Sequence, residues 1–108
     1  MKLKMYQVDA FTDKLFTGNP AAVVILESSL KDNEMQSIAF ENNLSETAFV
    51  SIHESPIYIR WFTPSIEVDL CGHATLASAR ILFEHYPELA GKEINFNSKS
   101  GILKITKN

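Results

Sequence analysis

The sequence contains a single cysteine, Cys71, so it cannot form a disulfide within one chain. Proteins without disulfides are typical of reducing compartments, and we therefore expect a cytoplasmic protein. An excess of basic residues is also missing, because 10 Lys and Arg residues stand against 13 Asp and Glu residues and the formal net charge is −3. This charge balance argues against a nucleic-acid-binding domain.

Long apolar runs are absent as well. No stretch approaches the roughly 18 consecutive apolar residues that cross a bilayer, and the N-terminal lysines are not followed by the apolar core of a signal peptide. The chain has no phosphate-binding loop, no glycine-rich dinucleotide motif, no HExxH zinc motif and no nucleophile elbow. Its composition, 45% hydrophobic and 21% charged, is that of a globular protein, and 108 residues suit a single domain, residues 1–108.

Local patterns predict six strands and two helices. Alternating or continuous apolar segments rich in Val, Ile, Phe and Tyr predict strands at residues 3–11, 21–26, 46–52, 57–62, 93–97 and 101–107. The second of these is apolar throughout, which is typical of a strand buried on both faces, and a turn is expected before it at residues 18–20. Helices are expected at residues 30–43, with Ser28 or Ser29 as N-cap, and at residues 74–86. The order of elements predicts an α+β domain with mostly antiparallel strands.

The second predicted helix is apolar over its first two turns, and its small residues are spread around every side. Such a helix is normally enclosed by other elements. In a small α+β protein the enclosing body would be a strongly curved sheet. We therefore expect a central helix wrapped by strands, with its N-terminus open to the surface at Gly72 and His73.

Gly72 and His73 are the first candidates for a binding site. A helix N-terminus presents unpaired backbone N–H groups and partial positive charge, which favour a bound carboxylate or phosphate. Gly72 would allow a ligand to approach the backbone closely, and His73 can donate or carry a proton near neutral pH. The plainer alternative is that Gly72 serves only the turn and His73 caps the helix.

Glu46 is the candidate for acid/base chemistry. It begins the third predicted strand, and by the strand period of two it shares a face with Ala48, Val50 and Ile52. A carboxyl group at the end of an apolar face is poorly solvated, and this favours its neutral form and suits a general acid/base. A solvated glutamate at the end of a strand is the ordinary alternative.

Cys71 allows three interpretations. As a thiolate at a helix N-terminus it could act as a base or nucleophile. With Asp69 and His73 it could suggest a metal site, but the spacing is not that of a known zinc site and no further Cys/His pair is present. A small apolar core residue is the interpretation that we favour.

Three stretches together resemble the phenazine biosynthesis PhzF-like family: DAFTDKLFTGNPAAVV at residues 9–24, NNLSETAFV at residues 42–50 and EVDLCGHATLASA at residues 67–79. Members of this family are related in fold to diaminopimelate epimerase. Each of their two halves wraps a curved sheet around a central helix, and the active site lies in the cleft between the halves. This chain resembles the N-terminal half.

The resemblance implies an isomerase that transfers a proton within a small carboxylate-bearing substrate. It places the catalytic glutamate of the family at Glu46 and the Gly-His pair of the family at Gly72 and His73. It implies no metal and no organic cofactor. The family carries an aspartate and further backbone donors of the site in the C-terminal half. The chain by itself is therefore expected to be inactive unless a partner supplies that half, and its exposed apolar wall favours a homodimer or other self-association.

Two other functions remain open. Diaminopimelate epimerases use a cysteine in each half, in a Cys-Gly-Asn-Gly pattern, and the corresponding stretch here begins at Cys71 but lacks the Asn-Gly. A cofactor-independent amino-acid racemase or epimerase that uses Cys71 is the second hypothesis. A non-catalytic domain that binds a small acid or a protein partner is the third.

Overall fold

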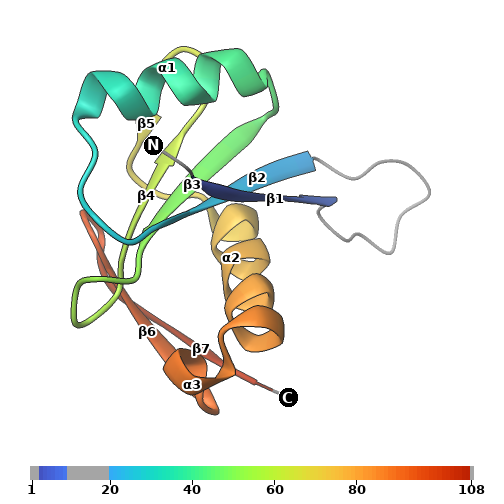
Figure 1. Ribbon diagram of the computed structural model, residues 1–108, viewed down its shortest axis with the longest axis vertical. Coiled ribbons are helices and arrows are strands. Elements are labelled where there is room, and N and C mark those ends of the chain that lie inside the picture. Colours follow the sequence, from blue (N-terminus) through green and yellow to red (C-terminus); the bar gives the residue numbers. More distant parts are fainter. Residues whose placement is uncertain (1–2, 10–19, 108) are drawn as a thin grey trace.

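One curved sheet, with a helix on each of its faces, makes up most of the structure (Figure 1). The computed structural model describes residues 3–9 and 20–107. The strands follow the order β1-β2-β3-β4-β6-β7, and the short strand β5 pairs with β4. Their bounds are β1 Lys4–Asp9, β2 Pro20–Leu26, β3 Glu46–Ser51, β4 Tyr58–Phe62, β5 Glu67–Val68, β6 Glu93–Ser98 and β7 Gly101–Thr106. The helices are α1 Asp32–Asn42, α2 Gly72–His85 and α3 Pro87–Ala90.

The predicted α+β class and the mostly antiparallel sheet are confirmed. Strand pairs β1–β2, β3–β4, β4–β5 and β6–β7 are antiparallel, whereas β2–β3 and β4–β6 are parallel. The continuous apolar segment of β2 is buried on both faces, as predicted, because α2 covers one face of the sheet and α1 covers the other. None of the described helices is long and apolar enough to span a membrane.

Alternation along the strands divides the core between the two faces. Ala48 and Val50 of β3 and Trp61 of β4 point toward α2, whereas Phe49 and Phe62 point toward α1. Phe49 and Phe62 meet edge to face, with ring centroids 5.3 Å apart, which is a favourable aromatic geometry. The face that carries Ala48 and Val50 therefore belongs to α2, and Glu46 lies on it by the same alternation.

Helix α2 is the predicted central helix, but the described strands enclose it on one side only. Its small residues Ala74, Ala77, Ser78 and Ala79 are buried in the concave face of the sheet. Leu76 is 60% exposed, and Figure 1 shows the open side of the helix. The sequence did not distinguish the two sides, because apolar residues lie on both.

Several predicted boundaries need correction. Neither Ser28 nor Ser29 caps α1: the N-cap is Lys31, whose backbone N–H donates to the Glu34 carboxylate at 2.9 Å. Helix α2 begins at Gly72, two residues earlier than predicted, because the Cys71 carbonyl already accepts the first helical hydrogen bond, from the Thr75 N–H.

The second helix does end before Pro87, but this proline also starts the short helix α3, since a proline is tolerated in a first helical turn. Strand β1 covers Lys4–Asp9 within the described part of the chain, inside the predicted range of residues 3–11. Residues 10–11 and the predicted turn, apart from the proline that begins β2, lie outside the described residues.

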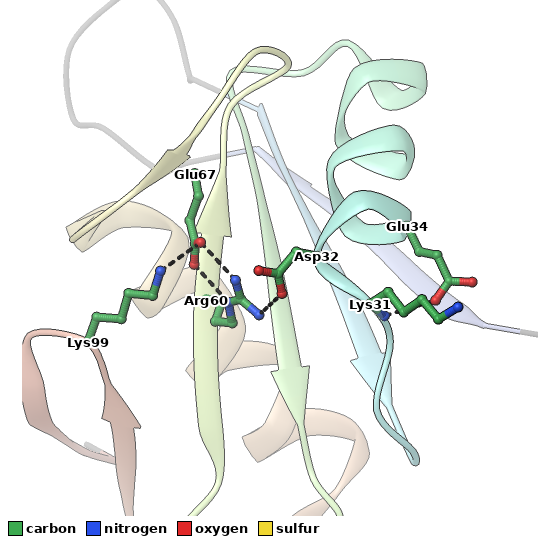
Figure 2. A network of polar contacts seen from close by, with 6 residues as sticks. All are labelled: Lys31, Asp32, Glu34, Arg60, Glu67 and Lys99. Carbon is green, nitrogen blue, oxygen red and sulfur yellow. Dashed lines mark hydrogen bonds and ion pairs between the residues drawn. The ribbon is translucent and has the colours of Figure 1, made fainter.

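A network of charged side chains fastens the α1 face of the sheet (Figure 2). The Arg60 guanidinium donates two hydrogen bonds to the Glu67 carboxylate, at 2.7 and 2.8 Å, and one to Asp32 at 2.9 Å. Lys99 donates to Glu67 at 2.8 Å. Hydrogen bonds from Arg60 lower the pKa of Glu67 to about 2, against an opposing effect of burial. The network joins β4, β5, the start of α1 and the turn between β6 and β7.

Acid should weaken this network. Because the pKa of Glu67 in the folded state lies below its ordinary value of 4.5, its contribution to stability is complete above pH 4.5 and is lost as the pH falls toward 2. The shift corresponds to roughly 3 kcal/mol, which solvent screening reduces to about 2 kcal/mol. The free energies of unfolding of the wild type and Glu67→Gln, measured in urea at several pH values, should therefore converge as the pH falls toward 2. Glu93→Gln, which changes an exposed pair with Lys104, is the control, and equal pH dependence of all three proteins would contradict the prediction.

Candidate functional site

The site lies where β3 begins and α2 begins. Glu46 is the first residue of β3, beside Ala21 of β2, and its side chain is on the α2 face of the sheet. His73 is the second residue of α2, and its Nε2 atom lies 3.9 Å from Glu46 Oε1. The side chains are 22% exposed for Glu46 and 36% exposed for His73. Two candidates that are 27 positions apart in the sequence therefore meet in the structure.

The carboxylate of Glu46 is unusual among the polar groups of the described chain. Its Oε1 atom is buried and accepts no hydrogen bond from any residue that the structure describes. A buried acceptor without a donor is costly, and such atoms are rare in folded proteins. At 3.9 Å the His73 ring is an ion-pair neighbour but is too far for a direct hydrogen bond. The Oε1 atom would therefore gain from a hydrogen-bond donor.

Gly72 leaves the first turn of α2 open. A Cβ atom added at this position would meet no atom of the described residues within 4 Å, and Gly72 is not among the glycines with positive φ. Neither packing nor backbone conformation in this part of the chain thus requires a glycine. The first turn of α2 also contains no acidic residue. A bound anion would meet no opposing charge from this turn of the helix.

Cys71 lies at the N-cap of α2, half-buried, beside the same carboxylate. Burial raises the pKa of the Cys71 thiol above its ordinary value of 9.0, and the charge of Glu46 raises that pKa further. The backbone N–H groups of Ala74 and His73 oppose this shift without cancelling it. The thiol therefore stays protonated near neutral pH and is a poor base. Its contact with the apolar core agrees with the structural role that the sequence favoured.

Trp61 and Thr75 hold the N-cap in place, and sequence reasoning missed this role. The Trp61 indole N–H donates to Thr75 Oγ1 at 3.0 Å, and the Thr75 hydroxyl donates to the Cys71 carbonyl at 2.8 Å. Neither Trp61 nor Thr75 is among the site residues predicted from the sequence. A threonine four residues after the N-cap is the signal that could have identified the second bond.

No metal centre joins these residues. Within residues 3–9 and 20–107 no group of three or more His, Cys, Asp and Glu side chains could hold a metal ion. Asp69 instead uses its backbone carbonyl to accept a hydrogen bond from Ser100.

The Trp61–Thr75 bond predicts a measurable coupling. Thr75→Val should lower the free energy of unfolding by about 1–3 kcal/mol, because it leaves the buried Trp61 N–H unpaired. Trp61→Phe should also lower it, because it removes the same hydrogen bond and leaves a smaller ring in the core. The double variant should lose about 1 kcal/mol less than the sum of the two single losses. Urea unfolding of the four proteins tests this, and strictly additive losses would show that the bond contributes nothing.

Cys71 offers a second test, of the geometry around Glu46. The rate of alkylation of Cys71 by iodoacetamide should rise with a pH midpoint above 9.0 in the wild type. Glu46→Gln should lower that midpoint, since it removes the neighbouring negative charge. Glu84→Gln, an exposed change in the last turns of α2, should leave it unaltered. An unchanged midpoint in Glu46→Gln would mean that the two side chains are not neighbours.

Comparison with known proteins relates the chain to one family. Residues 8–108 match the family model described as phenazine biosynthesis-like protein, PhzC-PhzF. An uncharacterized isomerase of Pseudomonas aeruginosa is 54% identical over 107 residues, which cover 99% of this chain and 41% of the relative. The chain thus spans about two fifths of the length of the curated relatives that it matches.

Solved structures support the same relationship. The crystal structure of a PhzF-family phenazine biosynthesis protein from Enterococcus faecalis superposes with a TM-score of 0.89 at 52% identity, and covers 100% of this chain and 41% of that protein. A structure from P. aeruginosa described as a predicted epimerase superposes with a TM-score of 0.76 at 28% identity, covering 95% of this chain and 37% of that protein. The fold is therefore of the diaminopimelate epimerase type, as the sequence indicated, and the chain belongs to the phenazine biosynthesis-like PhzC-PhzF family.

Proposed function

We propose that the chain is the glutamate-bearing half of an isomerase that moves a proton within a small carboxylate substrate. The observation that carries the proposal is the placement of Glu46: its buried Oε1 atom, without a hydrogen-bond donor among the described residues, lies 3.9 Å from His73 Nε2 at the N-terminus of α2. A general base needs such a poorly solvated carboxyl group beside a second proton carrier. The names of the relatives as isomerases support the reaction class.

In the proposed mechanism the substrate carboxylate binds the backbone N–H groups of Gly72 and His73. The partial positive charge of the α2 N-terminus favours this anion, and the absence of a side chain at Gly72 allows it to approach. Glu46 takes a proton from a carbon of the substrate, and the electron pair of that C–H bond moves into the adjacent unsaturated system. Glu46 returns the proton at another carbon, and His73 assists as hydrogen-bond donor or proton relay. Proton and electrons balance without any further reactant.

Cys71 is the weaker candidate for the base. A racemase of the two-cysteine type needs a thiolate, but burial and the Glu46 charge raise the pKa of the Cys71 thiol. Burial and the Glu46 charge instead favour a neutral thiol, which suits a Cys71 side chain that only packs beside the carboxylate. The epimerase hypothesis therefore ranks second, and it requires loss of activity in Cys71→Ala.

The site of the proposed enzyme extends beyond this chain. Because the relatives are more than twice as long, we propose that another polypeptide segment completes the cleft and that residues 1–108 alone are inactive. Leu70 and Leu76, which are 55% and 60% exposed, flank Cys71 and Gly72 and would meet that segment. In its absence they favour self-association of the chain.

Binding and proton exchange test the proposal. Acetate, crotonate and benzoate, titrated into the ¹⁵N-labelled chain, should shift the amide signals of Gly72 and His73. Gly72→Ala should abolish this shift without lowering the unfolding temperature, because the added methyl group meets no described atom. Leu89→Ala, at an exposed position in α3, is the matched control and should bind as the wild type does.

The catalytic part of the proposal needs a protein with both halves. In a protein that carries this chain as its N-terminal half, carbon-bound hydrogens of a turned-over carboxylate should exchange with D₂O. Glu46→Gln should slow this exchange by at least about 100-fold. Exchange at the wild-type rate in a natively folded Glu46→Gln protein would refute the role of Glu46, and abolition by Cys71→Ala instead would favour the epimerase.

A further inference from the structure

The segment at residues 67–71, here called the connecting segment, leads into α2 and determines where Cys71 and the start of that helix lie. Its backbone makes little strand pairing. Only two of its residues pair with β4, Glu67 opposite Phe62 and Val68 opposite Trp61. Side chains from other elements must therefore fix its course.

The first fixed point is Glu67, on the α1 face. Arg60 binds both oxygens of its carboxylate, and Lys99 binds Oε1 at 2.8 Å, as Figure 2 shows. The Arg60 and Glu67 side chains are each only 19% exposed, so this pair is shielded more than an ordinary surface ion pair.

The second fixed point is the backbone of Asp69. Its carbonyl accepts a hydrogen bond from Ser100 Oγ at 2.7 Å, across a separation of 31 residues. Ser100 and Lys99 are neighbours in the turn between β6 and β7. One turn, distant in sequence, therefore contacts the connecting segment at two places, two to four residues before Cys71.

The turn that carries Lys99 and Ser100 is itself rigidly built. Ser98 is buried, its hydroxyl donates to the Gly101 carbonyl at 2.8 Å, and the same oxygen accepts the Ser100 N–H at 3.1 Å. Gly101 has φ of +100°, a conformation that other residues rarely adopt. The turn is thus preorganised, and Lys99 and Ser100 project from a fixed base.

At the far end of the connecting segment, the Cys71 carbonyl is held by Thr75. Contacts at residues 67, 69 and 71 come from β4, the β6–β7 turn and α2, so the segment is fastened at alternate residues along its whole length. Leu70, between the last two contacts, is 55% exposed at the edge of the site.

We propose that Lys99 and Ser100 are positioning residues of the candidate site. By fixing Glu67 and the Asp69 carbonyl they set where Cys71 lies beside Glu46 and where the amide groups of Gly72 and His73 point. Any effect of this positioning on the binding of a carboxylate at the Gly72 and His73 amides rests on the proposed function. The inference about the position of Cys71 does not.

The test uses Ser100→Ala, Lys99→Met and the double variant of this chain. Lys104→Met, on β7 of the same hairpin with an exposed partner at 3.8 Å, is the matched control. The first readout is the rate of alkylation of Cys71 by iodoacetamide at fixed pH. We expect the double variant to react about five- to tenfold faster than the wild type. A net hydrogen bond of this kind favours the bonded arrangement by about this factor, and the double variant lacks it. The control should react at the wild-type rate. Ser100→Thr, which keeps the hydroxyl that Ser100→Ala removes, should also be alkylated as slowly as the wild type.

The second readout is the set of amide signals of Gly72 and His73, with their response to acetate. A purely structural contribution to the hairpin would lower the unfolding temperature but would not move these two signals selectively. Selective shifts at these amides with faster alkylation support the positioning role. Wild-type alkylation and unmoved amides in the double variant would overturn it.

The two proposals can fail separately. If acetate and the other carboxylates do not bind the wild type, yet alkylation of Cys71 accelerates in the double variant, the positioning role stands and the proposed function fails. If the carboxylates bind the wild type and the double variant with equal affinity and Cys71 reacts at the same rate in both, the positioning role fails alone.

Discussion

The close packing of α2 into the curve of the sheet is the constraint on which the other features depend. Ala74, Ala77, Ser78 and Ala79 leave room for the strands to approach the helix backbone. The buried Ser78 hydroxyl is satisfied inside the helix, by the Ala74 carbonyl at 2.7 Å, so it imposes no further partner on the strands. With the helix axis fixed in this way, its N-terminus has only one place to lie, which is beside the first residue of β3.

The two faces of the sheet carry different tasks. On the α1 face, charged groups of Arg60, Glu67 and Asp32 tie the elements together at the edge of an apolar cluster. On the α2 face, the indole of Trp61 fixes the helix start, and the carboxyl group of Glu46 lies without an ionic partner closer than 3.9 Å among the described residues. The ion pairs of the first face thus fasten the fold, whereas the carboxylate of the second face lies beside the start of α2.

Features encoded by local pattern could be predicted, and features encoded by distant contacts could not. The apolar segment of β2 and the face of Glu46 followed from periodicity alone, and the grouping of Glu46 with Gly72 and His73 came from the family resemblance. The N-cap at Lys31 was missed because serine is a better capping residue and stands only two or three positions earlier. The hydrogen bonds from Lys99 and Ser100 join residues more than 30 positions apart, and the open side of α2 depends on which strands are present. The spacing of apolar residues along the sequence carries no information about such contacts.

Strand β4 links the two systems through a single pair of adjacent residues, since Arg60 faces α1 and Trp61 faces α2. A one-residue insertion or deletion within this strand would exchange the faces of both side chains at once. It would place a guanidinium against α2 and an indole beside Glu67, and no single amino-acid substitution could repair both. Insertions and deletions near this strand should therefore be tolerated best in the exposed turn at residues 53–56 that precedes it.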